Sequence, residues 1–84
     1  MNLNRLRMLL EVSSSFEASS WTMLKHACFE KGISENSLHT LLRYARAMGL
    51  ITRRVDGRNT LYEITETGLA VLKALNNGGG AEQH

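Results

Sequence analysis

One segment restricts the fold of this chain more than any other: residues 33–68, in which the spacing of apolar residues changes twice. Apolar residues recur at helical spacing over residues 38–48 and stop at Gly49, a residue type that readily ends a helix in the left-handed conformation. The pattern then alternates as in a strand, and the Asp56-Gly57 pair favours a tight turn in which both central residues tolerate positive φ. A second alternating stretch follows. The segment therefore predicts a helix and then a β-hairpin.

Two helices are predicted before this segment. Leucines within residues 3–10 recur at helical spacing, and the pattern breaks at the three serines of residues 13–15. A second helix has Ser19 or Ser20 as its N-cap, because a serine side-chain oxygen accepts backbone N–H bonds at that position. Gly32 is expected to end this helix in the left-handed conformation.

Along the sequence, the predicted hairpin lies between the third helix and a last helix. Ser34 is the predicted N-cap of the third helix, and Asn36 is the competing cap. After the return strand, Thr65 is expected to cap the last helix, whose leucines continue at helical spacing. The predicted end of this helix is the Asn76-Asn77 pair.

These elements define an α+β fold that is mostly α, in the order helix, helix, helix, strand, strand, helix, with an optional minimal strand before the second helix. A chain of 84 residues has enough apolar surface for one core, so residues 1–77 are expected to form one domain and residues 78–84 a flexible tail. No stretch approaches the roughly 20 apolar residues of a membrane span, and the N-terminus lacks the cleavage site of a secretory signal. We therefore expect a cytoplasmic protein with no membrane contact.

The positive charge of the chain is concentrated around the hairpin. Five arginines lie between residues 36 and 62: Arg43, Arg46, Arg53, Arg54 and Arg58. Asp56 is the only acidic residue in this stretch, which therefore carries +4, while the rest of the chain, with five basic and seven acidic residues, carries −2 and brings the net charge to +2. A concentrated positive field attracts a polyanion better than a uniform one, so the sequence predicts nucleic-acid binding.

The third helix carries polar residues opposite its apolar stripe, and such a helix fits the major groove of double-stranded DNA. The expected contacts come from Asn36, Ser37, His39, Thr40, Arg43 and Arg46. Arg43 can bind guanine with its two-pronged side chain and Asn36 can pair with adenine, while Ser37, His39 and Thr40 reach bases or phosphates. Arg46 is expected to hold a phosphate or to bridge toward Glu35.

Residues on and beside the turn extend this surface. Arg54, Arg58 and Asn59 are expected to contact the adjacent DNA backbone or the minor groove, where arginine responds to narrow A-T tracts.

The stretch ISENSLHTLLRYARAMGLI, residues 33–51, resembles the recognition-helix signature of winged helix-turn-helix regulators of the MarR, PadR and ArsR kind. The stretch VDGRNTLYEITETG, residues 55–68, is similar to their wing, the hairpin that follows the recognition helix. In length the chain is similar to small archaeal, phage and viral winged-helix regulators. The resemblance implies a sequence-specific transcription regulator, with the helix residues in the major groove and Arg54, Arg58 and Asn59 as wing contacts.

The sequence gives weaker support to other classes of function. The alternative reading is a winged-helix protein-interaction module, for example an adaptor for polymerase or a replication complex, without direct DNA readout. The sequence has no phosphate-binding glycine loop and no nucleophile elbow, so we expect no enzyme. Cys28 is expected to be an inert core thiol, and the histidines lack partners at ligand spacing, so no metal and no cofactor are expected. Trp21 is expected in the core or on a dimer surface.

The first and last helices carry more apolar residues than one small core can cover, which predicts a homodimer through these two helices. The candidate contact residues are Met8, Val12, Val71 and Leu75. Two recognition helices related by a two-fold axis would meet successive major grooves, about 34 Å apart, on a near-palindromic site.

Overall fold

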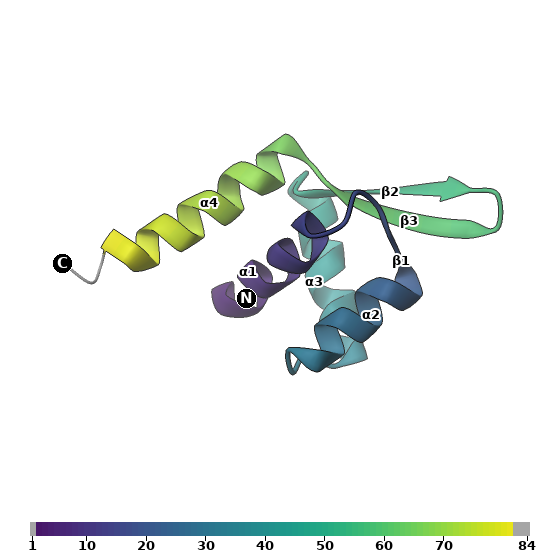
Figure 1. Ribbon diagram of the computed structural model, residues 1–84, viewed down its shortest axis with the longest axis horizontal. Coiled ribbons are helices and arrows are strands. Elements are labelled where there is room, and N and C mark those ends of the chain that lie inside the picture. The colour runs from purple at the N-terminus through teal and green to yellow at the C-terminus, as the bar shows by residue number, and fades with distance from the viewer. Residues whose placement is uncertain (1, 82–84) are drawn as a thin grey trace.

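The computed structural model describes the backbone of residues 2–81 and the side chains of residues 2–77. Its elements are α1 (Leu3–Ser14), β1 (Ser19–Ser20), α2 (Trp21–Glu30), α3 (Glu35–Ala47), β2 (Ile51–Asp56), β3 (Asn59–Ile64) and α4 (Glu66–Ala81). Figure 1 shows α1, α2 and α3 gathered in one bundle, with the β2–β3 hairpin projecting on one side and α4 on the other. The predicted order of elements is confirmed, and β1 is the minimal strand before α2.

Serine side chains cap the N-terminal ends of α2 and α3, and a glycine follows the C-terminal end of each. The Ser20 side chain accepts a hydrogen bond from the backbone N–H of Met23 (3.2 Å) and caps α2, and Ser34 caps α3. Gly32 and Gly49 follow α2 and α3 with φ of 86° and 73°, the left-handed region in which other residues are strained. Both predicted helix stops are therefore confirmed.

The turn of the hairpin lies one residue later than predicted. β2 and β3 are antiparallel and pair Asp56 with Asn59, so the two central turn residues are Gly57 and Arg58. Of these two, Gly57 alone has positive φ, at 64°. Positive φ on a glycine at the first central position is the pattern of a type II′ turn, whereas the predicted Asp-Gly centre would have required it at both positions.

The register of the sheet decides which side chains face α3. The strand order is β1-β3-β2, and Arg53 is opposite Tyr62 while Arg54 is opposite Leu61. Because successive side chains alternate between the two faces, Arg53 shares a face with Ile51, which is 1% exposed in the core. Arg54 consequently lies on the face that is turned away from the core.

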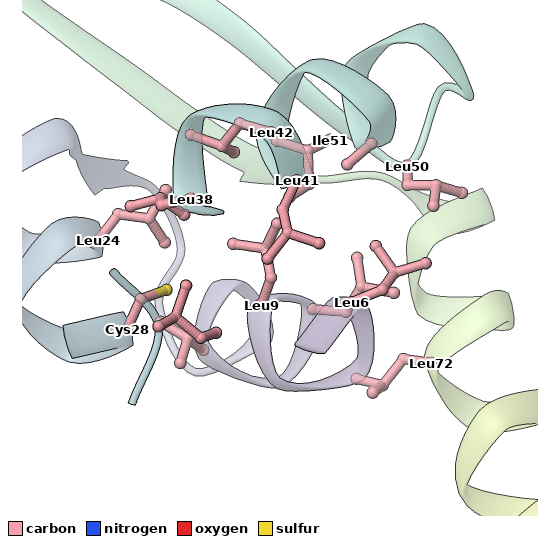
Figure 2. Packing of buried hydrophobic residues seen from close by; sticks show 14 residues of the cluster. Leu6, Leu9, Leu24, Cys28, Leu38, Leu41, Leu42, Leu50, Ile51 and Leu72 are labelled. Carbon is pink, nitrogen blue, oxygen red and sulfur yellow. The ribbon is translucent and has the colours of Figure 1, made fainter. Parts of the chain in front are cut away.

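The core collects leucines from all four helices (Figure 2). Its buried hydrophobic members are Leu6, Leu9, Leu10, Val12, Leu24, Cys28, Ile33, Leu38, Leu41, Leu42, Ala45, Leu50, Ile51 and Leu72. Each fully buried leucine contributes about 1.5–3 kcal/mol through the removal of apolar surface from water. Val12 was predicted as a dimer contact, and this prediction is wrong: Val12 is 4% exposed and packs inside the same core.

Thr65 joins the start of α4 to the end of α3. Its backbone N–H donates to the carbonyl oxygen of Leu50 (2.9 Å), and its hydroxyl donates to the carbonyl oxygen of Gly49 (2.6 Å). The same hydroxyl oxygen accepts from the N–H of Gly68 (3.0 Å), which confirms Thr65 as the cap of α4.

The predicted end of α4 is wrong, because the helix continues through the asparagine pair to Ala81. Neither Asn76 nor Asn77 adopts the positive φ that would have ended it. Residues 82–84 lie outside the described residues, and the division into a domain and a flexible tail stays a prediction. None of the described helices is long and apolar enough to cross a membrane.

Candidate nucleic-acid interface

The outer side of α3 presents most of the predicted groove-facing residues. Asn36, His39, Thr40, Arg43 and Arg46 are exposed, and Ser37 is half-buried. The opposite side of the helix carries the buried leucines. At about 100° per residue, Asn36, Thr40 and Arg43 lie most directly opposite that buried side. These three side chains are therefore the ones that α3 presents outward along its length.

The start of α1 adds a basic residue that the sequence did not predict. Arg5 Nη1 donates to the hydroxyl oxygen of Ser37 (3.3 Å), and the Ser34 hydroxyl donates to the same oxygen (3.1 Å). Arg5 thus borders a shallow hollow of about 300 Å³ that Asn36 and Thr40 also line. Nothing in the sequence indicates this contact, because it joins two helices 32 residues apart.

His39 is exposed, but its ring contacts other side chains of the protein. Its ring stacks on Trp21 with a centroid distance of 4.7 Å and an angle of 27°, and Tyr62 lies on Trp21 at 6.3 Å. The Nε2 atom of His39 is 3.8 Å from a carboxylate oxygen of Glu35. Trp21 is half-buried and packs against the core, one of its two predicted places, and its ring also faces His39 of α3 and Tyr62 of β3. The alternative, a dimer surface, stays a prediction.

The predicted hairpin contacts differ in their surroundings. Arg54 Nη2 is 2.9 Å from Glu63 Oε1 on the neighbouring strand, so this guanidinium already has an anionic partner. Arg58 is exposed in the turn, and Asn59 is exposed at the first position of β3. The turn thus leaves the Arg58 side chain exposed, with Asp56 two residues before it, while Arg54 on the outer face is paired with Glu63.

Arg53 is the residue that the sequence interpretation passed over. Arg53 lies on the inner face of β2, and with Arg43 and Arg46 it lines a hollow of about 500 Å³ between α3 and β2. Its alternation with buried Ile51 was the available signal, because that alternation turns Arg53 toward α3 and Arg54 away. Arg46 lines the same hollow. Its expected bridge toward Glu35 is not formed, since Glu35 faces Lys25 and His39.

The remaining candidates for chemistry lie away from this surface. Burial raises the pKa of the Cys28 thiol to about 11, against a smaller opposite effect of Lys31. A raised pKa removes the thiolate that makes cysteines reactive. Among the described residues, no group of three or more His, Cys, Asp or Glu side chains is arranged to hold a metal ion.

Solved structures of similar shape are consistent with this geometry. Sso10a-2, a DNA-binding protein from Sulfolobus solfataricus, matches 99% of this chain and 82% of its own with a TM-score of 0.81 and 14% identity. A PadR family transcriptional regulator from Eggerthella lenta matches 94% of this chain and 75% of its own, with a TM-score of 0.69 and 24% identity. The transcriptional regulator HlyU from Vibrio vulnificus matches 90% and 75%, with a TM-score of 0.60 and 26% identity.

No protein-family profile matches the chain, and no curated protein sequence is significantly similar to it. The structural likeness and the order of elements define the class: this chain has the winged-helix fold, in which the β2–β3 hairpin that follows α3 is the wing. The winged-helix resemblance found in the sequence is confirmed at the level of the fold.

Proposed function

We propose that this chain is a sequence-specific transcription regulator that binds double-stranded DNA, with α3 in the major groove and the hairpin on the adjacent backbone or minor groove. The observation that carries the proposal is the continuity of one exposed surface: the outward side of α3 passes directly into the basic hairpin, with Arg43 and Arg46 on the helix and Arg53 on the strand beside them. The names of the similar structures, a DNA-binding protein and transcription regulators, support the same function.

Within this surface the proposed base readers are Asn36, Thr40 and Arg43. They lie most directly opposite the buried side of α3, so they would project deepest into a groove that α3 enters. Ser37 and His39 are tied to Arg5 and Trp21, so we assign them to the edges of the contact. Arg54, Arg58 and Asn59 would lie along the adjacent backbone or minor groove, with Arg54 shared between DNA and Glu63.

We further propose a homodimer through α1 and α4. Leu3 on α1 is 58% exposed and Leu69 on α4 is 48% exposed, while Val71 and Leu75 are half-buried. Figure 1 shows α4 extending well beyond the helical bundle. Leu72 is buried and Val71 and Leu75 pack against the core, so Leu3 and Leu69 are the apolar residues most open to a partner chain. A partner chain would bury this surface and set two copies of α3 on successive major grooves.

Selection of bound fragments from a random pool of double-stranded DNA tests the proposal. Purified protein should enrich near-palindromic sequences whose half-sites are about 10 base pairs apart, centre to centre. Light scattering after size exclusion should give twice the chain mass. A pool that is not enriched, together with no retention of DNA in dilute buffer, would favour the protein-interaction module instead.

A further inference from the structure

We propose that Arg46 of α3 and Arg53 of β2 together form a binding site for one phosphate group, in the cleft between the end of α3 and the inner face of the hairpin. This inference rests on the proposed function where the phosphate belongs to DNA. It adds Arg53 to the interface and gives the two adjacent hairpin arginines different roles.

The cleft consists of two adjoining hollows. One, of about 500 Å³, is bounded by α3 and β2, and the other, of about 280 Å³, extends to β3. Arg43, Arg46 and Arg53 line both of them. The other lining residues of the two hollows are His39, Leu42, Ala47, Ile51, Thr52 and Tyr62. We call this region the arginine cleft.

The arginine cleft concentrates positive charge without an internal partner. Within the part of the chain whose side chains are described, none of its three guanidinium groups forms an ion pair, and no carboxylate lines either hollow. Charged residues near the cleft do form ion pairs: Arg54 is paired with Glu63, and Glu35 with Lys25. Like charges lining one concave surface repel each other, so this arrangement is stabilised when an anion enters.

The chemistry of the cleft favours phosphate. A guanidinium presents several N–H donors in a planar fork that fits phosphate oxygens, and two such groups from different elements can hold the oxygens from two sides.

The place of the cleft on α3 fits a DNA phosphate. Arg46 is three residues after Arg43, which is about 60° around the helix, toward the hairpin. If Arg43 faces base edges, Arg46 and Arg53 meet the sugar-phosphate strand that borders the major groove on the hairpin side. A free phosphate ion would offer the cleft the same chemistry, so the experiment separates the two sources.

The first arm measures how DNA affinity depends on salt for Arg53→Gln and for Arg54→Gln. These residues are adjacent and of the same type but lie on opposite faces of β2. Arg54 is shared with Glu63, so the second variant is a matched comparison for a hairpin arginine that lies outside the cleft and already has an anionic partner. Loss of one phosphate contact should reduce the slope of log affinity against log salt by about 0.9 in Arg53→Gln and should weaken selected and random DNA by the same factor. Arg54→Gln should change the slope by less than half as much.

The second arm titrates inorganic phosphate into the protein without DNA and follows the side-chain Nε–Hε signals of arginine by NMR. Saturable shifts of the Arg46 and Arg53 signals would show a phosphate site that takes the free ion. The Arg46 shift should be lost in Arg53→Gln, and both shifts should be retained in Arg54→Gln. If the wild-type protein does not bind DNA, the proposed function fails and this arm alone decides whether the cleft binds phosphate.

The outcomes separate cleanly. A reduced slope in Arg53→Gln supports a DNA phosphate, and phosphate-induced shifts with an unchanged slope support the free ion. DNA binding by the wild type, with the wild-type slope retained in Arg53→Gln and no phosphate-induced shifts, would overturn the inference and leave the proposed function standing.

Discussion

The carbonyl oxygen of Leu50 occupies the space that a side chain on Gly68 would need. A Cβ atom built on Gly68 would collide with that oxygen and would lie 2.7 Å from Cγ1 of Ile64. This close approach brings the first turn of α4 against the segment between α3 and β2, where Thr65 bonds to the same carbonyl oxygen. The orientation of α4 relative to the hairpin therefore depends on a glycine in the first turn of the helix.

Replacing Gly68 by alanine should destabilise the protein, by about 1–3 kcal/mol in the free energy of unfolding measured with urea. Alanine favours a helix by about 1 kcal/mol over glycine, so the expected sign depends on the collision being the larger effect. Thr67→Ala, at an exposed neighbouring position of α4, is the control and should change stability little. A more stable Gly68→Ala variant would contradict the packing described for α4.

The stack of His39 on Trp21 can be tested with the fluorescence of the single tryptophan. His39→Ala should expose the indole and shift its emission to longer wavelength, with a loss of about 0.5–1.5 kcal/mol in stability if the stacking behaves as other aromatic pairs do. Thr40→Ala, at the adjacent exposed position, should leave the emission unchanged. Identical spectra for wild type and His39→Ala would argue against the aromatic cluster.

Arg43 and Arg58 should differ in what they contribute to DNA binding. Arg43→Ala should reduce the preference for the selected sequence over other sequences by about 1–3 kcal/mol, because a base contact is lost. Arg58→Ala, in the turn, should weaken binding to all sequences alike. Competition binding with selected and scrambled fragments measures both quantities, and equal effects of both substitutions on every sequence would speak against α3 as the reading element.

The buried thiol of Cys28 should make stability depend on pH in alkaline solution. Its pKa is raised from 9.0 to about 11 in the folded protein, so the unfolded chain loses the proton first as pH rises. The stabilisation is complete below about pH 9 and is lost between pH 9 and 11, by roughly 2–3 kcal/mol. The difference in unfolding free energy between wild type and Cys28→Ala should shrink over this range, and a constant difference would contradict the assignment.

Much of the fold could be predicted because local signals agree with the tertiary structure. Glycines at the ends of α2 and α3 and the serine caps are local features, and the structure uses them as predicted. The turn was misplaced by one residue because Asp-Gly is compatible with two registers, and cross-strand pairing rather than the dipeptide selects Gly57-Arg58. The end of α4 was misplaced because asparagine permits a left-handed cap without imposing it.

The candidate site was less predictable, because it depends on how elements face one another. Helical periodicity correctly predicted that Asn36, Thr40 and Arg43 lie on the exposed side of α3. It could not show that Arg5 reaches Ser37 from α1. Strand alternation shows that Arg53 and Ile51 share one face of β2. Predicting that Arg53 lies beside α3 would also have required knowing that this face packs toward α3.

The most direct test of the central claim is the affinity of the purified protein for a selected fragment and for a scrambled one, measured between about 50 and 200 mM salt. A sequence-specific DNA-binding protein should bind the selected fragment tightly, prefer it by at least about a thousandfold, and lose affinity for both fragments steeply as salt rises. Equal and weak retention of the two fragments, or none at the lowest salt concentration, would contradict the proposed function.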